Sequence, residues 1–132
     1  MMDATRARTK RAQPEAAIQR AIVDYLAAVA PHIVCYAVPN GSKRTKGGRA
    51  GNAVPGLTKG IPDLALVFSG RAHFLEVKAP KGRTSPDQDA TIARLRRAGA
   101  SVEVVRSIDD VEFALAAWGV VTRQAKQGRA AA

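Results

Sequence analysis

The chain has 132 residues, a length typical of one domain that buries its own core. Its formal net charge is +10, from 21 Lys and Arg residues against 11 Asp and Glu residues, which favours a polyanionic partner. The single cysteine, Cys35, excludes a disulfide framework within the chain and favours a reducing, cytoplasmic location, and no apolar run reaches the roughly 20 residues of a membrane span.

The N-terminal third predicts an arm, a helix and a strand. Residues 1–12 are rich in basic side chains and poor in apolar ones, which is typical of a flexible arm. Apolar residues then recur at helical spacing and predict a helix over 14–30, with Pro14 in its first turn and Pro31 after its end. The Val, Ile and Tyr content of residues 32–38 predicts a short, largely buried strand.

A long basic loop follows this strand. The chain has no acidic residue between Tyr25 and Pro62, and residues 40–59 combine five glycines with several basic side chains. Loops of this length are commonly functional, and the charge indicates a surface for a polyanion. The alternative interpretation is that the excess positive charge only keeps a small protein soluble. We predict contacts with nucleic acid from Lys43, Arg44, Lys46, Arg49 and Lys59, and from two basic residues further along the chain, Lys81 and Arg83.

The second half of the chain alternates strands and helices. Two strands are predicted over 61–68 and 72–79, followed by a helix over 86–98, a strand over 102–105 and a helix that begins after Ser107. Ser85 and Gln88 form the sequence signature of a capping box at the start of the first of these helices. The order predicts an α/β fold with a small mixed sheet flanked by helices, as one domain over 13–119 with a basic tail over 120–132.

Candidate catalytic residues come from the tight hairpin at Ser69-Gly70. A two-residue loop pairs Phe68 with Arg71 and therefore sets Asp63 opposite Glu76. Opposed carboxylates are destabilising unless a cation lies between them, and Mg²⁺ takes such oxygen ligands. A four-residue loop would set Asp63 opposite Lys78 and keep both carboxylates on one face, whereas a three-residue loop would separate them.

Strand alternation adds further residues to this site. Glu76 and Lys78 share one face, while Leu75 and Val77 point into the core, and the main-chain carbonyl of Val77 could face a metal. Lys78 could activate a water or stabilise charge on a phosphate. An ordinary exposed ion pair is the alternative reading. Glu15 lies at the N-terminal end of the apolar stripe of the first helix, where it either reaches the sheet or serves as a first-turn acid.

These residues resemble the motif of the PD-(D/E)XK nuclease superfamily, in Pro62-Asp63 and Glu76-Val77-Lys78. The wider runs over 59–64, 76–80 and 85–88 are similar to the VRR-NUC family, including its standalone members from phages and bacteria. Residues 104–107, Val-Val-Arg-Ser, resemble the last core strand of that family, although its arginine pair is only partly reproduced.

The resemblance implies a restriction-endonuclease-like αβββαβ core, Mg²⁺ or Mn²⁺ as cofactor, and hydrolysis of phosphodiester bonds in DNA. Standalone members are similar to Holliday-junction resolvases, which implies a homodimer, branched DNA as substrate, and a bacterial or phage origin. The resemblance assigns Asp63, Glu76 and Val77 to the metal and Asp63, Glu76, Lys78, Glu15 and Gln88 to catalysis.

The leading hypothesis is therefore a structure-selective, metal-dependent endonuclease. The alternative is a non-catalytic nucleic-acid-binding protein that keeps the nuclease-like fold and uses only its charge. A basic RNA-binding protein of the ribosomal kind is a third reading, and it leaves the opposed carboxylates unexplained.

Overall fold

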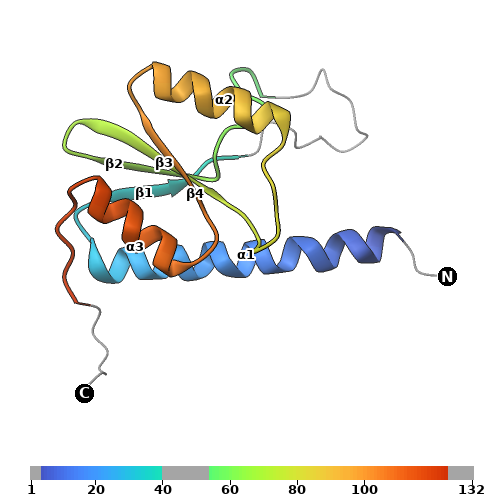
Figure 1. Ribbon diagram of the computed structural model, residues 1–132, viewed down its shortest axis with the longest axis horizontal. Helices are drawn as coiled ribbons and strands as arrows, with labels where there is room; N and C mark the ends of the chain where they lie inside the picture. The colour runs from blue at the N-terminus through green and yellow to red at the C-terminus, as the bar shows by residue number, and fades with distance from the viewer. Residues whose placement is uncertain (1–3, 40–53, 125–132) are drawn as a thin grey trace.

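Helices cover both faces of one four-stranded sheet in the computed structural model, which describes residues 4–39 and 54–124 (Figure 1). The elements are α1 (Ala4–Val29), β1 (Val34–Ala37), β2 (Leu64–Phe68), β3 (Arg71–Val77), α2 (Pro86–Arg97), β4 (Ser101–Val105) and α3 (Ile108–Ala117). The strand order is β1-β2-β3-β4, with antiparallel pairing up to β3 and parallel pairing of β3 with β4. The predicted α/β class, with a mixed sheet between helices, is confirmed.

The core lies between the sheet and the helices α1 and α3. Ile22 and Leu26 of α1, Leu66 and Leu75 of the central strands, and Leu115 of α3 are each at most 2% exposed. Burying a side chain of this size stabilises the fold by about 1.5–3 kcal/mol. Helix α2 packs beside β4 on the opposite face, so among the described elements the sheet face that carries Glu76 has a helix over one of its edges only (Figure 1).

Helix α1 begins at Ala4, so the prediction of a flexible arm is wrong for the backbone of residues 4–12. Alanine, arginine and lysine are among the strongest helix formers, and this segment consists largely of them. Pro14 therefore lies inside the helix rather than in its first turn, where it removes one main-chain hydrogen bond. The apolar periodicity begins only where the helix meets the core, which is why the periodicity predicted a later start for the helix.

Strand β1 is an edge strand, and the prediction that it is largely buried is wrong. Val34 is 61% exposed and Tyr36 is 53% exposed, on the same face as Val67 of β2, which is 39% exposed. The strand is apolar in composition, but helix α2 packs against β4 at the far edge of that face and leaves β1 exposed. Cys35, on the other face, is partly buried and packs against the core.

The hairpin between β2 and β3 has the predicted two-residue loop. Ser69 and Gly70 have φ values of 52° and 73°, and positive φ at both positions is the geometry of a type I′ turn. Phe68 pairs with Arg71, which confirms the predicted register. Strand β2 begins only at Leu64, so residues 61–63 precede the strand instead of belonging to it.

The segment after α3 packs back onto α1. The main-chain N–H of Arg123 donates to the Val29 carbonyl at 2.8 Å, and its side-chain Nε donates to the Ala28 carbonyl at 2.9 Å. Within the predicted basic tail, Arg123 is therefore held against α1, while residues 125–132 lie outside the described part of the chain. Among the helices that the structure describes, none has the length and apolar character needed to span a bilayer.

Candidate active site

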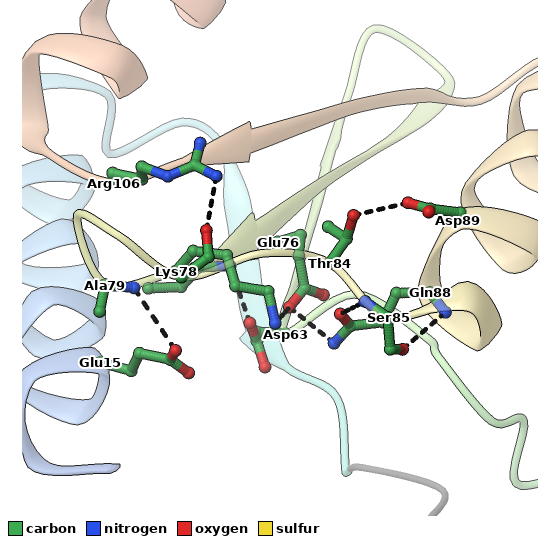
Figure 2. A network of polar contacts seen from close by, with 12 residues as sticks. Glu15, Asp63, Glu76, Lys78, Ala79, Thr84, Ser85, Gln88, Asp89 and Arg106 are labelled. Carbon is green, nitrogen blue, oxygen red and sulfur yellow. Dashed lines mark hydrogen bonds and ion pairs between the residues drawn. The ribbon is translucent and has the colours of Figure 1, made fainter. Parts of the chain in front are cut away.

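Asp63 and Glu76 face each other across the end of the β2–β3 hairpin. The register pairs Leu64 with Leu75, and its next step sets Asp63 opposite Glu76, as the sequence predicted. The main-chain N–H of Val38 donates to the Asp63 carbonyl at 2.9 Å, which continues the β1–β2 ladder by one residue. The Asp63 side chain accepts a 2.8 Å hydrogen bond at Oδ2 from the main-chain N–H of Val77, so its carboxylate is held beside β3 (Figure 2).

The carboxylate of Glu76 is almost fully buried, at 2% exposed, and its two oxygens differ. Oε2 accepts a 3.0 Å hydrogen bond from Nε2 of Gln88 and lies 3.3 Å from Nζ of Lys78. Oε1 is buried and has no hydrogen-bond partner among the described residues. Because an unsatisfied buried carboxylate oxygen is costly, Oε1 is the atom at this site that requires a further ligand.

The electrostatics of Glu76 also indicate a missing positive charge. Burial, followed by the charge of Asp63, raises the pKa of Glu76 to about 8, although the Lys78 ammonium opposes the shift. Without a bound metal ion, the raised pKa favours the protonated carboxyl at neutral pH even with the Lys78 ammonium 3.3 Å away. A divalent cation between the two carboxylates would remove both the repulsion and the unsatisfied oxygen.

The donor set fits a hard divalent cation. Asp63 and Glu76 offer carboxylate oxygens, and no three His, Cys, Asp or Glu side chains gather anywhere in residues 4–39 and 54–124. Mg²⁺ is typically held by one or two carboxylates, with waters and substrate phosphates completing its octahedron. The N–H of Val77 points toward Asp63, and in an extended strand the carbonyl of the same residue points to the same side. The predicted set of Asp63, Glu76 and Val77 therefore suits Mg²⁺ or Mn²⁺.

Gln88 is oriented by the capping box at the start of α2, which is confirmed. The Ser85 side chain accepts from the Gln88 N–H at 3.1 Å, and the Gln88 Oε1 accepts from the Ser85 N–H at 2.9 Å. With Oε1 occupied in this way, Nε2 faces Glu76. A local helix signal thus places a hydrogen-bond donor at the candidate site.

Glu15 approaches the sheet from α1 but does not join the carboxylate pair. Its Oε2 accepts a 3.4 Å hydrogen bond from the main-chain N–H of Ala79, the residue after Lys78 (Figure 2). A Cβ atom built on Gly82 would lie 3.5 Å from the same oxygen. Glu15 therefore contacts the segment that leaves β3, and its part in catalysis stays a prediction.

The predicted nucleic-acid-binding residues fall into two groups. Lys59, Lys81 and Arg83 are exposed, on the segment before β2 and on the segment between β3 and α2. The Lys59 carbonyl accepts a 2.7 Å hydrogen bond from the buried Thr91 hydroxyl of α2, which anchors the first of these segments. The other four, Lys43, Arg44, Lys46 and Arg49, lie outside the described residues.

Arg106 also lies beside the candidate site, although no role at this site was predicted for it. Its guanidinium donates a 2.8 Å hydrogen bond to the Gly82 carbonyl, in the segment that Glu15 also contacts (Figure 2). The parallel register pairs Val77 with Val105, which sets Arg106 beside Lys78. The resemblance of residues 104–107 to the family's last core strand was the signal in the sequence for Arg106, and the parallel pairing of β3 with β4 is what brings it to the site.

The VRR-NUC domain model matches residues 13–109, a range that contains every residue of the candidate site. The chain belongs to the VRR-NUC domain family. This family is a group of PD-(D/E)XK-type nucleases, so the chain has a nuclease-type domain, and nucleases of this type bind DNA and are usually dependent on a divalent metal.

A solved structure described as a VRR-NUC domain is similar to this chain. The two are 24% identical, with a TM-score of 0.55 over 78% of this chain and 95% of the other. At this identity the likeness establishes a shared fold, and it agrees with the order of helices and strands described above. No curated protein matches this chain.

Proposed function

We propose that this VRR-NUC protein is a metal-dependent endonuclease that hydrolyses phosphodiester bonds in branched or junction DNA. The observation that carries the proposal is the Glu76 carboxylate, buried opposite Asp63, with Lys78 and Gln88 on one oxygen and no partner for the other among the described residues. A buried carboxylate without full compensation is costly for stability and is typical of a functional site.

Asp63, Glu76 and the Val77 carbonyl would hold Mg²⁺ or Mn²⁺. When bound, the cation lowers the pKa of water and neutralises negative charge on a phosphate. The hydrogen bond from the Val77 N–H keeps the Asp63 carboxylate in place before any ligand arrives. Such preorganisation avoids reorientation of the ligands during the reaction.

Lys78 and Gln88 act on the same carboxylate oxygen. The Lys78 ammonium, 3.3 Å from Glu76 Oε2, places a positive charge at the edge of the site, where it stabilises the charge that develops on the phosphate. Gln88 fixes the rotation of the Glu76 carboxylate and so directs Oε1 away from both donors. Glu15 acts one step further out, by holding the main chain immediately after Lys78.

The basic side chains would bind the DNA backbone. Lys59, Lys81 and Arg83 are exposed on the two segments that flank the site. We propose the same phosphate-binding role for Lys43, Arg44, Lys46 and Arg49, which lie outside the described residues. Contacts with phosphates position the substrate without reading its sequence. Affinity should therefore depend weakly on sequence and fall steeply with salt.

A homodimer would suit a branched substrate. The described residues of one chain hold one pair of opposed carboxylates, whereas a junction presents two related strands. Two copies related by a twofold axis would set one site on each strand. Light scattering at micromolar concentration measures this directly, and a monomeric mass on saturation with junction DNA would refute it.

The decisive experiment is metal-dependent cleavage. Purified protein is incubated with four-way, flapped and plain duplex DNA, with Mg²⁺, with Mn²⁺ or with chelator. We expect cleavage with either cation, none with chelator, and a loss of at least about 100-fold in the Glu76→Gln and Lys78→Ala variants. Glu103→Gln is the matched control, because Glu103 is an exposed carboxylate on β4 and should retain full activity.

Three results would overturn the proposal in different ways. Cleavage that persists in both the Glu76 and Lys78 variants would mean that the assigned site is wrong. Salt-sensitive DNA binding without cleavage in either metal would favour a non-catalytic DNA-binding protein. Tight binding of RNA without a metal requirement would favour the RNA-binding alternative.

A further inference from the structure

Tyr36 lies beside the carboxylate pair on the same face of the sheet. It pairs with Ala65 in the β1–β2 register, and the next residues on that face, Val38 and Asp63, continue the ladder. Tyr36 is thus a diagonal neighbour of Asp63, and such neighbours are about 7–8 Å apart, within reach of an aromatic side chain. Tyr36 is 53% exposed, so its ring meets solvent at the edge of the candidate site.

The ring belongs to an apolar strip formed by Val34, Tyr36 and Val67. Val34 is directly opposite Val67, and both point to the same face as Tyr36. Their side chains are 61% and 39% exposed, respectively. Helix α2 packs beside β4, at the other edge of this face. The strip is thus an uncharged, exposed surface that begins next to Asp63 and continues along β1 and β2.

An uncharged aromatic surface at this position does not serve the DNA backbone. Phosphates are bound by basic groups and by the cation, and neither is part of the strip. An aromatic ring instead fits the face of a nucleobase, which stacks on Phe, Tyr or Trp in proteins that bind single strands. Within a duplex both faces of each base are covered by neighbouring bases, so only an unpaired nucleotide offers its face.

We propose that Tyr36 stacks on an unpaired base adjoining the phosphate that is bound at Asp63 and Glu76. Among branched substrates, the enzyme then prefers those with an unpaired nucleotide next to the cut, such as a flap, over fully paired junctions, and Tyr36 is a specificity-determining residue. This inference rests on the proposed nuclease function. A second copy of the chain is a poorer occupant, because three side chains offer much less than the roughly 800 Å² per partner of a stable interface.

The test measures stacking separately from cleavage. Oligonucleotides carry 2-aminopurine, whose fluorescence falls when it stacks, either in a single-stranded overhang or within a paired duplex. Binding is measured with Ca²⁺ in place of Mg²⁺, so that the carboxylate pair keeps a divalent cation, and a gel checks that no strand is cut, for wild type, Tyr36→Ala and Tyr36→Phe. Phe113→Ala is the matched control, since Phe113 is an aromatic residue 78% exposed on α3, which packs on the other face of the sheet.

We expect wild type and Tyr36→Phe to quench the unpaired probe, because stacking requires the ring and not the hydroxyl. Tyr36→Ala should lose the quenching and about 5- to 100-fold in affinity for overhang DNA, with little change for fully paired duplex. The Phe113→Ala variant should behave as wild type. In cleavage with Mg²⁺, the same loss should appear as a higher KM for overhang DNA.

Each other outcome overturns a defined part of the inference. Equal affinity of Tyr36→Ala and wild type for overhang DNA, with cleavage intact, would refute stacking and leave the nuclease function standing. Quenching by wild type without any metal-dependent cleavage would refute the nuclease function and keep Tyr36 as a base-binding residue. A fall in molecular mass in Tyr36→Ala, with equal losses on duplex and overhang DNA, would show that the strip joins two copies of the chain.

Discussion

Gln88 and Glu76 are joined by a 3.0 Å hydrogen bond in which the glutamine amide is the donor and Oε2 of the buried carboxylate is the acceptor. The other end of the same amide accepts the Ser85 N–H at 2.9 Å and closes the capping box of α2. One side chain therefore links the stability of a helix start to the orientation of a candidate metal ligand.

Substitution of Gln88 should separate these two roles. In Gln88→Glu the cap is kept, because a carboxylate also accepts the Ser85 N–H, but a third negative charge replaces the donor to Glu76. We expect cleavage to fall by at least about tenfold, in line with the loss of an oriented donor at a charged centre. Ser85→Ala is the converse variant: it should cost about 1 kcal/mol of stability and leave cleavage nearly unchanged. Equal effects of both variants on cleavage would contradict this division.

The raised pKa of Glu76 makes the stability of the metal-free protein depend on pH. The folded state holds a proton up to about pH 8, whereas the unfolded chain releases it near the ordinary pKa of 4.5. The unfolded state therefore binds fewer protons between these values, and the free energy of unfolding should fall as pH rises, by at most about 1.4 kcal/mol per pH unit. Urea unfolding in chelator at pH 6, 7 and 8 measures this slope. It should flatten in Glu76→Gln, and a rising slope in wild type would refute the assignment.

His73 should produce the opposite dependence at acid pH. Its ring is 3% exposed, stacks on Phe68 with a centroid distance of 4.0 Å and lies 4.7 Å from the Trp118 ring. Burial, and then the charge of Arg71, lowers the pKa of His73 below its usual 6.5. The unfolded chain thus binds the extra proton first, and the stability of wild type should decrease as pH falls below about 6.5.

A His73→Phe variant isolates this term, because it keeps the aromatic packing and removes Nδ1, which is buried without a partner in the described residues. Thermal unfolding between pH 7 and pH 5 should show a smaller loss for the variant than for wild type. Parallel curves for the two proteins would show that another group governs acid stability.

Gly60 packs against the first turn of α2, and its substitution tests how that contact positions Asp63. Its φ is +76°, and a Cβ atom at this position would overlap the Asp87 carbonyl. Gly60→Ala should therefore destabilise the protein by more than the roughly 1–2 kcal/mol of a left-handed alanine alone. Gly70→Ala supplies that reference, since Gly70 has a φ of +73° and open space around its Cβ position. Chemical denaturation compares the two, and equal losses would mean that the segment before β2 moves freely relative to α2.

Local chemistry determined the parts of this protein that the sequence predicts well. Gly70 tolerates the positive φ that a two-residue hairpin loop requires, and with the register of that turn the opposition of Asp63 and Glu76 follows by counting. The capping box of α2 is equally local, because Ser85 and Gln88 are three residues apart. The motif runs over 59–64, 76–80 and 85–88, which indicated the family, lie on or next to these locally determined elements, whereas the run over 104–107 belongs to β4.

The tertiary structure decided what depends on distant segments. Exposure of Val34 and Tyr36 follows from where α2 packs, and the contact of Arg106 with Gly82 follows from the parallel pairing of β3 with β4. The burial of Glu76, which raises its pKa, also requires α2 and β4 to close around β3. Composition cannot distinguish an apolar strand at the edge of a sheet from one at its centre, because burial is a property of the neighbours that a strand acquires on folding.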